Sequence, residues 1–550
     1  MKRCPECRLD YYDDTLLFCL EDGTALVQGS VLSPNEPQTA ILHETTPPNE
    51  VATRAHIHMT DQPAHPMRTG DVVPEREGVS PPFPGRTTAP PASSIAVLPF
   101  SRLSSDPDDE YFCDGLAEEL INALAKIDDL KVVARTSAFS FKGKNVEISQ
   151  IGSALNVKNI IEGSVRKFGD RMRITVQLIN ASDGYHVWSE KYDTDMHDLF
   201  DAQDRITLAV VDALKKKLFW NTESDQIAPL IEGLKHHASD VEAYQLYLRG
   251  KFFFNKFTPD DFYRALDCFH KALEIDPNYA AAYAGLADAH VFLTEFGPVP
   301  PREAMPKAKE AALKAIALDP TLADAHASLA LVLGEFEFDF VEAEKACRRA
   351  VELNPNSSLA HQYYGGMMAQ LGRHAEAEIM FLKAFELDPL SPAANWIYPF
   401  GLFFTRRYDE CIEKAKKILE LDPNFSAAIL ILSFAYQMKE DFAASVEAYA
   451  RFVELCGAPD VAAAGRRAFA QDGWQGFLQA ATSPAAKAAV TSYMTATYYD
   501  ALGDNESALE FLEGSFEKRE GHIVMLKADP RFEKLRSDGR FRLLIDRIGF

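Results

Sequence analysis

Residues 377–389, AEIMFLKAFELDP, carry the pattern that decides the fold of most of this 550-residue chain. The small residue Ala377 is followed by Phe381 four positions later, then by Ala384 and finally by Pro389. The same spacing occurs at Ala265-Phe269-Ala272-Pro277, Ala308-Ala312-Ala315-Pro320, Ala343-Cys347-Ala350-Pro355 and Cys411-Ala415-Ile418-Pro423. Pro355, Pro389 and Pro423 are 34 residues apart. Self-similarity at a fixed period predicts an array of structural repeats.

Each position of the pattern has a physical reason in a pair of packed helices. The first small residue lets the second helix approach the first closely, and the bulkier residue one turn later fills the space between them. Proline ends the helix because it has no N–H to donate. Residues 359–372 fit the first helix of such a pair, with His361, Tyr364, Gly365 and Met368 on its buried stripe.

The period and the A-x3-F-x2-A-x4-P core resemble the tetratricopeptide repeat family over residues 239–457. A loop at 296–303 and the displaced Pro459 of a sixth unit depart from the pattern. Residues 458–550 are expected to be helical, with one degenerate repeat and a C-terminal cap. The resemblance implies an all-α solenoid whose concave groove binds a peptide or helix of a partner protein. On the repeat register, the groove positions are Gln362, Trp396, Phe400, Phe434 and Gln437.

Residues 94–220 mix strand and helix signals and predict a small α/β domain. Residues 94–100, SIAVLPF, form a compact apolar run typical of a buried strand, and residues 110–127 have apolar residues at helical spacing. Strands over 160–167 and 172–180 precede an amphipathic helix over 202–218.

This domain resembles the TolB amino-terminal-like family. The segments that carry the resemblance are SIAVLPF (94–100), YFCDGLAEEL (111–120), IEGSV (161–165) and WSEKY (188–192). The resemblance implies a non-catalytic domain, here a second interaction or dimerisation surface. Asp114, Glu118 and Glu119 are expected to complement the dipole of a helix near its start, and not to form a catalytic carboxylate pair.

Residues 1–30 are expected to form a small module that resembles a zinc ribbon in its cysteine spacing. Cys4 and Cys7 have the spacing of a zinc knuckle and Cys19 adds a third thiol, but Asp22 stands where a fourth cysteine would complete the site. Asp22 ligating through oxygen, a histidine from the following segment, and a module without metal all remain open. Any Zn²⁺ here would be structural.

Residues 31–93 hold 12 of the 31 prolines and are expected to be a disordered linker. The formal net charge of −24 disfavours generic nucleic-acid binding. No stretch has the roughly 20 apolar residues that a membrane span needs, and no secretory signal is visible. We therefore expect a cytoplasmic protein.

No phosphate-binding loop, dinucleotide fingerprint or nucleophile-elbow motif occurs in the sequence. The predicted fold class is multidomain: a short zinc-ribbon-like module, a small α/β domain and a tetratricopeptide-repeat solenoid. The predicted function is a non-catalytic scaffold that binds a protein partner, with a homo-oligomer left open. The alternative is a regulatory or signalling subunit whose zinc ribbon contacts a transcription or signalling partner.

Overall fold

The computed structural model describes two separate units of the chain, which divide near residue 81. In the first unit it describes only the strands β1 (Lys2–Arg3), β2 (Asp10–Tyr11) and β3 (Val27–Gln28), an antiparallel sheet in the order β2-β1-β3. Cys4, Cys7, Cys19 and Asp22 lie outside the described residues. In the second unit it describes residues 90–550 except 92, 104–108, 128–129, 169–170, 196–198, 219–239, 257 and 296–298.

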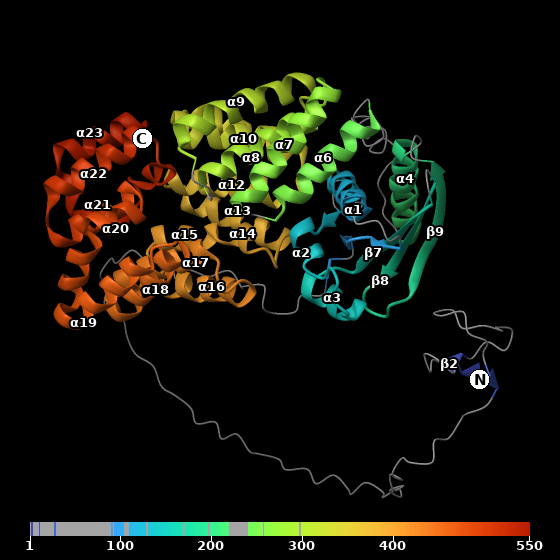
Figure 1. The fold of residues 1–550 in the computed structure, drawn as a ribbon, viewed down its shortest axis with the longest axis horizontal. Coiled ribbons are helices and arrows are strands. Elements are labelled where there is room, and N and C mark those ends of the chain that lie inside the picture. Colours follow the sequence, from blue (N-terminus) through green and yellow to red (C-terminus); the bar gives the residue numbers. More distant parts are fainter. Residues whose placement is uncertain are drawn as a thin grey trace, which may run out of the picture. The chain divides into compact units, whose positions relative to one another are not determined.

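A small mixed sheet forms the first part of the second unit (Figure 1). Its strands run in the order β6-β4-β7-β8-β9, with β5 beside β7. Strand β4 lies between two parallel neighbours, and β7, β8 and β9 form an antiparallel meander. The elements here are β4 (Ser94–Val97), β5 (Ser101–Arg102), α1 (Asp109–Ala125), β6 (Lys131–Val132), α2 (Arg135–Phe139), α3 (Ile148–Leu155), β7 (Asn159–Phe168), β8 (Arg171–Asn180), β9 (His186–Asp195) and α4 (Leu199–Leu218).

Helices cover both faces of this sheet, which explains why β4 is apolar without alternation. Ile95 and Val97 pack into the cluster that contains side chains of α1 and α4. Ala96, between them, packs on the other face against Ile151 and Leu155 of α3. The sequence predicted β4, α1, β7, β8 and α4, but not the short α2 and β5.

The remainder of the second unit is helical, and its helices pack in consecutive pairs (Figure 1). The paired helices are α6 (Val241–Phe254) with α7 (Pro259–Ile275), α8 (Ala280–Glu295) with α9 (Pro301–Leu318), α10 (Ala323–Leu331) and η3 (Val332–Glu337) with α11 (Phe340–Leu353), α12 (Ser358–Gln370) with α13 (His374–Leu387), α14 (Pro392–Asn395) and α15 (Ile397–Phe404) with α16 (Tyr408–Leu421), and α17 (Ser426–Met438) with α18 (Phe442–Leu455). The C-terminal elements are α19 (Pro459–Ala481), α20 (Pro484–Ala489), α21 (Ser492–Leu502), α22 (Asn505–Lys518), η4 (Gly521–Met525), η5 (Pro530–Ser537) and α23 (Gly539–Ile548). This region has the architecture expected of tetratricopeptide repeats.

The packing inside a pair follows the residue pattern. Phe381 is 3% exposed, and a Cβ built on either Gly365 or Gly401 would lie 2.6 Å from its ring. Glycine at these two positions therefore lets helices α12 and α15 approach the ring of α13 from both sides. Ala377 and Ala384 are buried on the same helix, as the sequence predicts.

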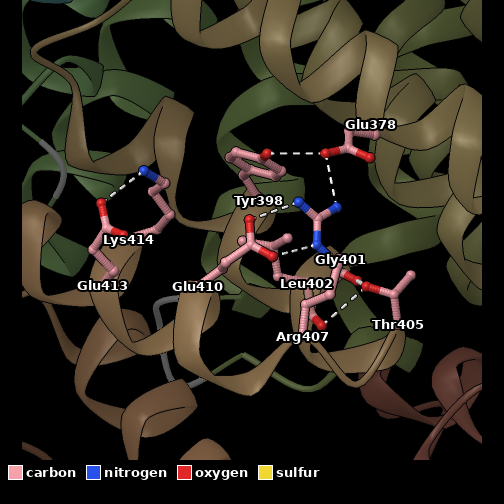
Figure 2. Close-up of polar contacts among 9 residues, drawn as sticks. All are labelled: Glu378, Tyr398, Gly401, Leu402, Thr405, Arg407, Glu410, Glu413 and Lys414. Carbon is pink, nitrogen blue, oxygen red and sulfur yellow. Dashed lines mark hydrogen bonds and ion pairs between the residues drawn. The ribbon is translucent and has the colours of Figure 1, made fainter. Parts of the chain in front are cut away.

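A polar cluster joins neighbouring pairs (Figure 2). It occurs twice, at the period of the repeats. Arg407 donates to both carboxylate oxygens of Glu410 at 2.7 Å and to Glu378 at 2.9 Å, while the Tyr398 hydroxyl donates to Glu378 at 3.2 Å. The same set of contacts occurs 34 residues earlier in the chain, among Tyr364, Arg373, Glu344 and Glu376. Ion pairs of fixed geometry thus set how consecutive pairs meet.

The C-terminal helices, which were predicted to cap the stack, also pack against an earlier repeat. The ring of Phe550 stacks on Phe340 of α11 with centroids 4.8 Å apart. Phe516 of α22 lies beside Phe338, and the guanidinium of Arg519 sits 4.0 Å from the Phe338 ring. Residues separated by about two hundred positions therefore share one core.

Candidate partner-binding cavity

The inner side of the helix array encloses a cavity of about 550 Å³. Its wall is built mainly by the first helix of each pair, from α6 to α17, because these helices carry the buried stripe toward the inside. Other segments complete it, among them α2 with Thr136, α21 with Met494 and the turn Arg519–Met525. The sequence predicted an open concave groove, but these segments narrow it into a partly enclosed chamber.

The chamber has an acidic end beside α6, α8 and α10. The Asp288 carboxylate is 5% exposed and accepts a hydrogen bond from the Ser328 hydroxyl. Its burial, with Asp324 close by, raises its pKa to about 7. Lys251 also lines this end and pairs with Glu118 of α1 at 3.5 Å.

The electrostatics of Lys251 couple the α/β domain to the cavity. Burial works against its ammonium charge, but Glu118, Asp324 and Asp288 outweigh that effect and raise its pKa. On the α1 side, Arg135 also holds Glu118, at 2.9 Å. The lysine is therefore a permanent cation of the wall, already shared among several carboxylates.

A second acidic position lies further along the same helix. Glu335 belongs to η3, a π-helical turn continuing α10, and its carboxylate accepts a hydrogen bond from Gln370 of α12 at 3.5 Å. Burial raises its pKa to about 7. A π-helical turn displaces side chains from the regular register and often marks functional sites.

The α/β domain docks on the repeats beside the cavity. The Val132 and Ala134 amides point away from β4, and they donate to Asn356 Oδ1 at 3.1 Å and to the Leu387 carbonyl at 2.8 Å. The Asn356 amide donates in turn to the carbonyls of Ala125 and Leu130, both at 3.0 Å. The repeats thus cover the outer edge of β6, which would otherwise present unpaired backbone groups.

A second docking contact centres on a buried carboxylate. Asp388 accepts hydrogen bonds from the Ser137 amide at 3.0 Å and the Ser137 hydroxyl at 2.6 Å. Burial raises the pKa of Asp388 to about 6 in spite of these donors. No sequence pattern predicts this contact, because Asp388 occupies the ordinary turn position before Pro389.

The five predicted groove residues separate into two groups. Gln362, Trp396 and Phe400 line the cavity, with the two aromatic rings edge to face at 5.1 Å. Phe434 is 2% exposed and covered by the Arg531 guanidinium, 3.8 Å from its ring centre. Gln437, half-buried in the last turn of α17, is not part of the lining.

The acidic residues of α1 form ion pairs and not an isolated carboxylate pair. Lys142 donates to Asp114 at 2.8 Å and to Glu110 at 2.7 Å. Burial raises the pKa of Asp114 even with Lys142 and Arg135 near it. Burial also raises the pKa of Glu119, to about 7. Within residues 90–550, as far as they are described, no cluster of histidine, cysteine and acidic side chains is arranged to hold a metal ion. Nor does any described helix combine the length and apolarity needed to cross a bilayer.

Comparison with known proteins relates the α/β domain to regulators. Residues 91–209 match a family model described as the second domain of HilA/YgeH-like transcriptional regulators. The putative adenylate cyclase 3 of Rhizobium meliloti is 37% identical over 249 residues, which is 44% of this chain and 40% of that protein. The transcriptional regulator HilA of Salmonella typhimurium is 24% identical over 310 residues, 54% of this chain and 51% of that protein. The chain therefore spans about half or less of these relatives.

Solved structures similar to the chain are helical repeat proteins. PilF of Pseudomonas aeruginosa is 18% identical, with a TM-score of 0.28 over 45% of this chain and 95% of that one. Yeast Tom70 is 16% identical, with a TM-score of 0.33 over 64% of this chain and 83% of that one. The repeat architecture of this chain accordingly rests on its own helix pairs and their period.

Proposed function

We propose that this chain is a non-catalytic scaffold that binds a protein partner in the cavity on the inner side of its repeats. The observation that carries the proposal is the cavity itself, which is lined by successive first helices and by the aromatic pair Trp396 and Phe400. Aromatic side chains at the centre of a concave surface provide much of the affinity in protein interfaces. The α/β domain supports the wall and supplies a second surface.

Blocking the cavity tests this proposal. Gly366 of α12 lines it, and a Cβ at this position would meet only Ile397, at 3.8 Å. Gly366→Phe should fill the cavity without disturbing the helix pair. Gly514→Phe is the matched control, because a Cβ on Gly514 of α22 meets no atom within 4 Å.

The assay is capture of partner proteins by the immobilised full-length chain, with mass spectrometry of the bound fraction. The specific set captured by the original chain should be lost with Gly366→Phe and kept with Gly514→Phe. An identical set on both variants would show that the cavity is not the binding site.

The name of the cyclase relative raises a direct question about catalysis. We propose that the present chain does not convert ATP, since Asp114 and Glu118 of α1 are engaged by Lys142 and Arg135. Purified chain incubated with ATP and Mg²⁺ or Mn²⁺ should form no cyclic AMP. Formation above the level of heat-treated protein would overturn the non-catalytic assignment.

A second candidate is a regulatory subunit, which the match of residues 91–209 to a transcriptional-regulator domain favours. In this case the N-terminal module, with a structural Zn²⁺ on Cys4, Cys7, Cys19 and Asp22, would contact the regulated partner. Metal analysis of the full-length chain and of the Cys4→Ser/Cys7→Ser variant tests the ligand set. If partner capture is unchanged in that variant, the module is not the contact.

A further inference from the structure

The cavity holds more carboxylates than its cations neutralise. Asp288, Asp324 and Glu335 all line it. With the residues described in this unit, none of the three forms an ion pair. Lys251 is the cation nearest to the first two in electrostatic effect, but its ammonium pairs with Glu118.

Two other carboxylates of the wall are held by hydrogen bonds, and Arg519 packs on an aromatic ring while its buried Nη1 has no hydrogen-bond partner among the described residues. Asp388 binds Ser137, and Glu520 accepts hydrogen bonds from the backbone amides of Ser492 and Tyr493 at the start of α21. Asp288 and Glu335 each accept one side-chain hydrogen bond, from Ser328 and Gln370, and neither they nor Asp324 form an ion pair with the described residues. Burial raises the pKa of Asp288 and of Glu335 to about 7, so a cation entering this space would favour their ionised forms, whereas an anionic group would not.

The positions of the carboxylates favour an elongated ligand. Asp288 is hydrogen-bonded to Ser328 of α10 and so lies beside that residue. Glu335 follows Ser328 by seven residues, in η3, which continues α10. Asp324 lies one turn before Ser328. At a rise of about 1.5 Å per residue, the acidic end formed by Asp288 and Asp324 lies roughly 10 to 16 Å from Glu335 along the helix. An extended chain covers that distance in about three to five residues.

The segments of this chain that precede the α/β domain have the wrong charge for the site. Residues 31–93 contain seven acidic and four basic side chains, and residues 1–30 contain six acidic and three basic ones. Like charges would oppose their entry. The complementary occupant is thus a different, basic polypeptide.

We propose that the cavity binds an extended basic segment of the partner protein, with Lys or Arg side chains paired to Asp288 and Asp324 at one end and to Glu335 at the other. This inference rests on the scaffold function proposed above and specifies the chemistry of its partner. The apolar wall between the two acidic positions, which includes Phe292 and Leu331, contacts the intervening side chains.

Fluorescence anisotropy with defined peptides tests the inference on the full-length chain. The probe is labelled Arg-Val-Ser-Val-Arg-Val-Ser-Val-Arg, and its counterpart has Glu at every Arg position. About 150 mM salt keeps general attraction to the acidic surface screened. The basic probe should bind and the acidic one should not. Binding of both, or of neither, would overturn the proposal.

A matched pair of variants separates the cavity from the overall charge. Asp324→Asn/Glu335→Gln and Glu274→Gln/Glu310→Gln each replace two carboxylates with amides, but Glu274 and Glu310 are exposed and outside the cavity. The first variant should weaken binding of the basic probe by at least about tenfold, and the second by less than about twofold. Equal weakening would place the probe on the general surface, and so would unchanged binding to Gly366→Phe.

Spermidine distinguishes a peptide from a small organic cation. It should displace the probe only at concentrations far above that of unlabelled basic peptide. If spermidine binds in a manner that depends on Asp324 and Glu335 while the peptide does not, the assignment to a polypeptide is wrong. Loss of partner capture in Gly366→Phe together with no binding of basic peptide would leave the scaffold function standing and remove only this inference.

Discussion

Replacing Asn356 with alanine should detach the edge of the α/β domain from the repeats. The side chain accepts from the Val132 amide and donates to the carbonyls of Ala125 and Leu130. Each such bond contributes roughly 0.5–1.5 kcal/mol, so losing three should lower the free energy of unfolding by about 2–4 kcal/mol. The upper part of that range applies if water cannot reach the freed backbone groups.

Two measurements check this prediction. Urea unfolding of the full-length chain gives the change in stability, and hydrogen exchange of the segment around Val132 reports local opening. Asn424→Ala is the matched control, because Asn424 follows Pro423 in the same register but is exposed. It should change stability by less than about 0.5 kcal/mol. If the two variants have the same stability and the same exchange at Val132, the docking contact does not hold the domain in place.

Three other substitutions probe the core, the cavity and the C-terminal region. Gly365→Val should destabilise the chain by about 1–3 kcal/mol in urea unfolding, because its Cβ would lie 2.6 Å from the Phe381 ring. Burial raises the pKa of Asp288 to about 7; its stabilising contribution is thus full below about pH 4 and is lost as the pH rises through 7. Asp288→Asn should therefore make urea midpoints fall less between about pH 5 and pH 8. Arg531→Ala should cost about 3–5 kcal/mol in thermal unfolding, since it leaves the Asp529 carboxylate, 2.6 Å from Arg531 and fully buried, without its cation.

Controls for these variants are available in the same chain. Gly514→Val, at a position with open space around it, should avoid the steric cost of Gly365→Val. Glu310→Gln, at an exposed position outside the cavity, is the control for Asp288→Asn. Arg531→Lys should recover part of the stability lost with alanine. Equal effects of a variant and its control would contradict the corresponding packing, titration or ion-pair argument.

The relatives match this chain over part of its length. The match to a regulator domain covers residues 91–209, and the cyclase relative shares 249 residues with this chain. In the present structure the α/β domain packs directly against the repeats. Asn356, Asp388 and Lys251 of the repeats all form hydrogen bonds or an ion pair with it. Lys251 lines the cavity and pairs with Glu118 of the α/β domain. A ligand in the cavity would therefore contact a residue that is bound to that domain.

Local pattern was sufficient to predict the helix pairs. The spacing Ala377-Phe381-Ala384-Pro389 predicts its own burial, since each small or bulky residue faces a helix only a few residues away in the chain. The strands β4, β7 and β8 were predictable from their own apolar residues in the same way. The groove positions were only partly predictable: Trp396 and Phe400 line the cavity, but Phe434 lies beneath Arg531, a residue almost one hundred positions later.

The sequence by itself determined the repeat, its period and the turn that closes each pair, because these depend on contacts between near neighbours. Asn278, Asn356 and Asn424 each follow a proline and each donate their backbone amide to the residue two positions earlier. Nothing local distinguishes them. Only the tertiary structure decided that Asn356 meets β6, and that Asp288 and Glu335 face one enclosed space. Both facts depend on contacts between residues far apart in the sequence. Spacings between near neighbours do not predict such contacts.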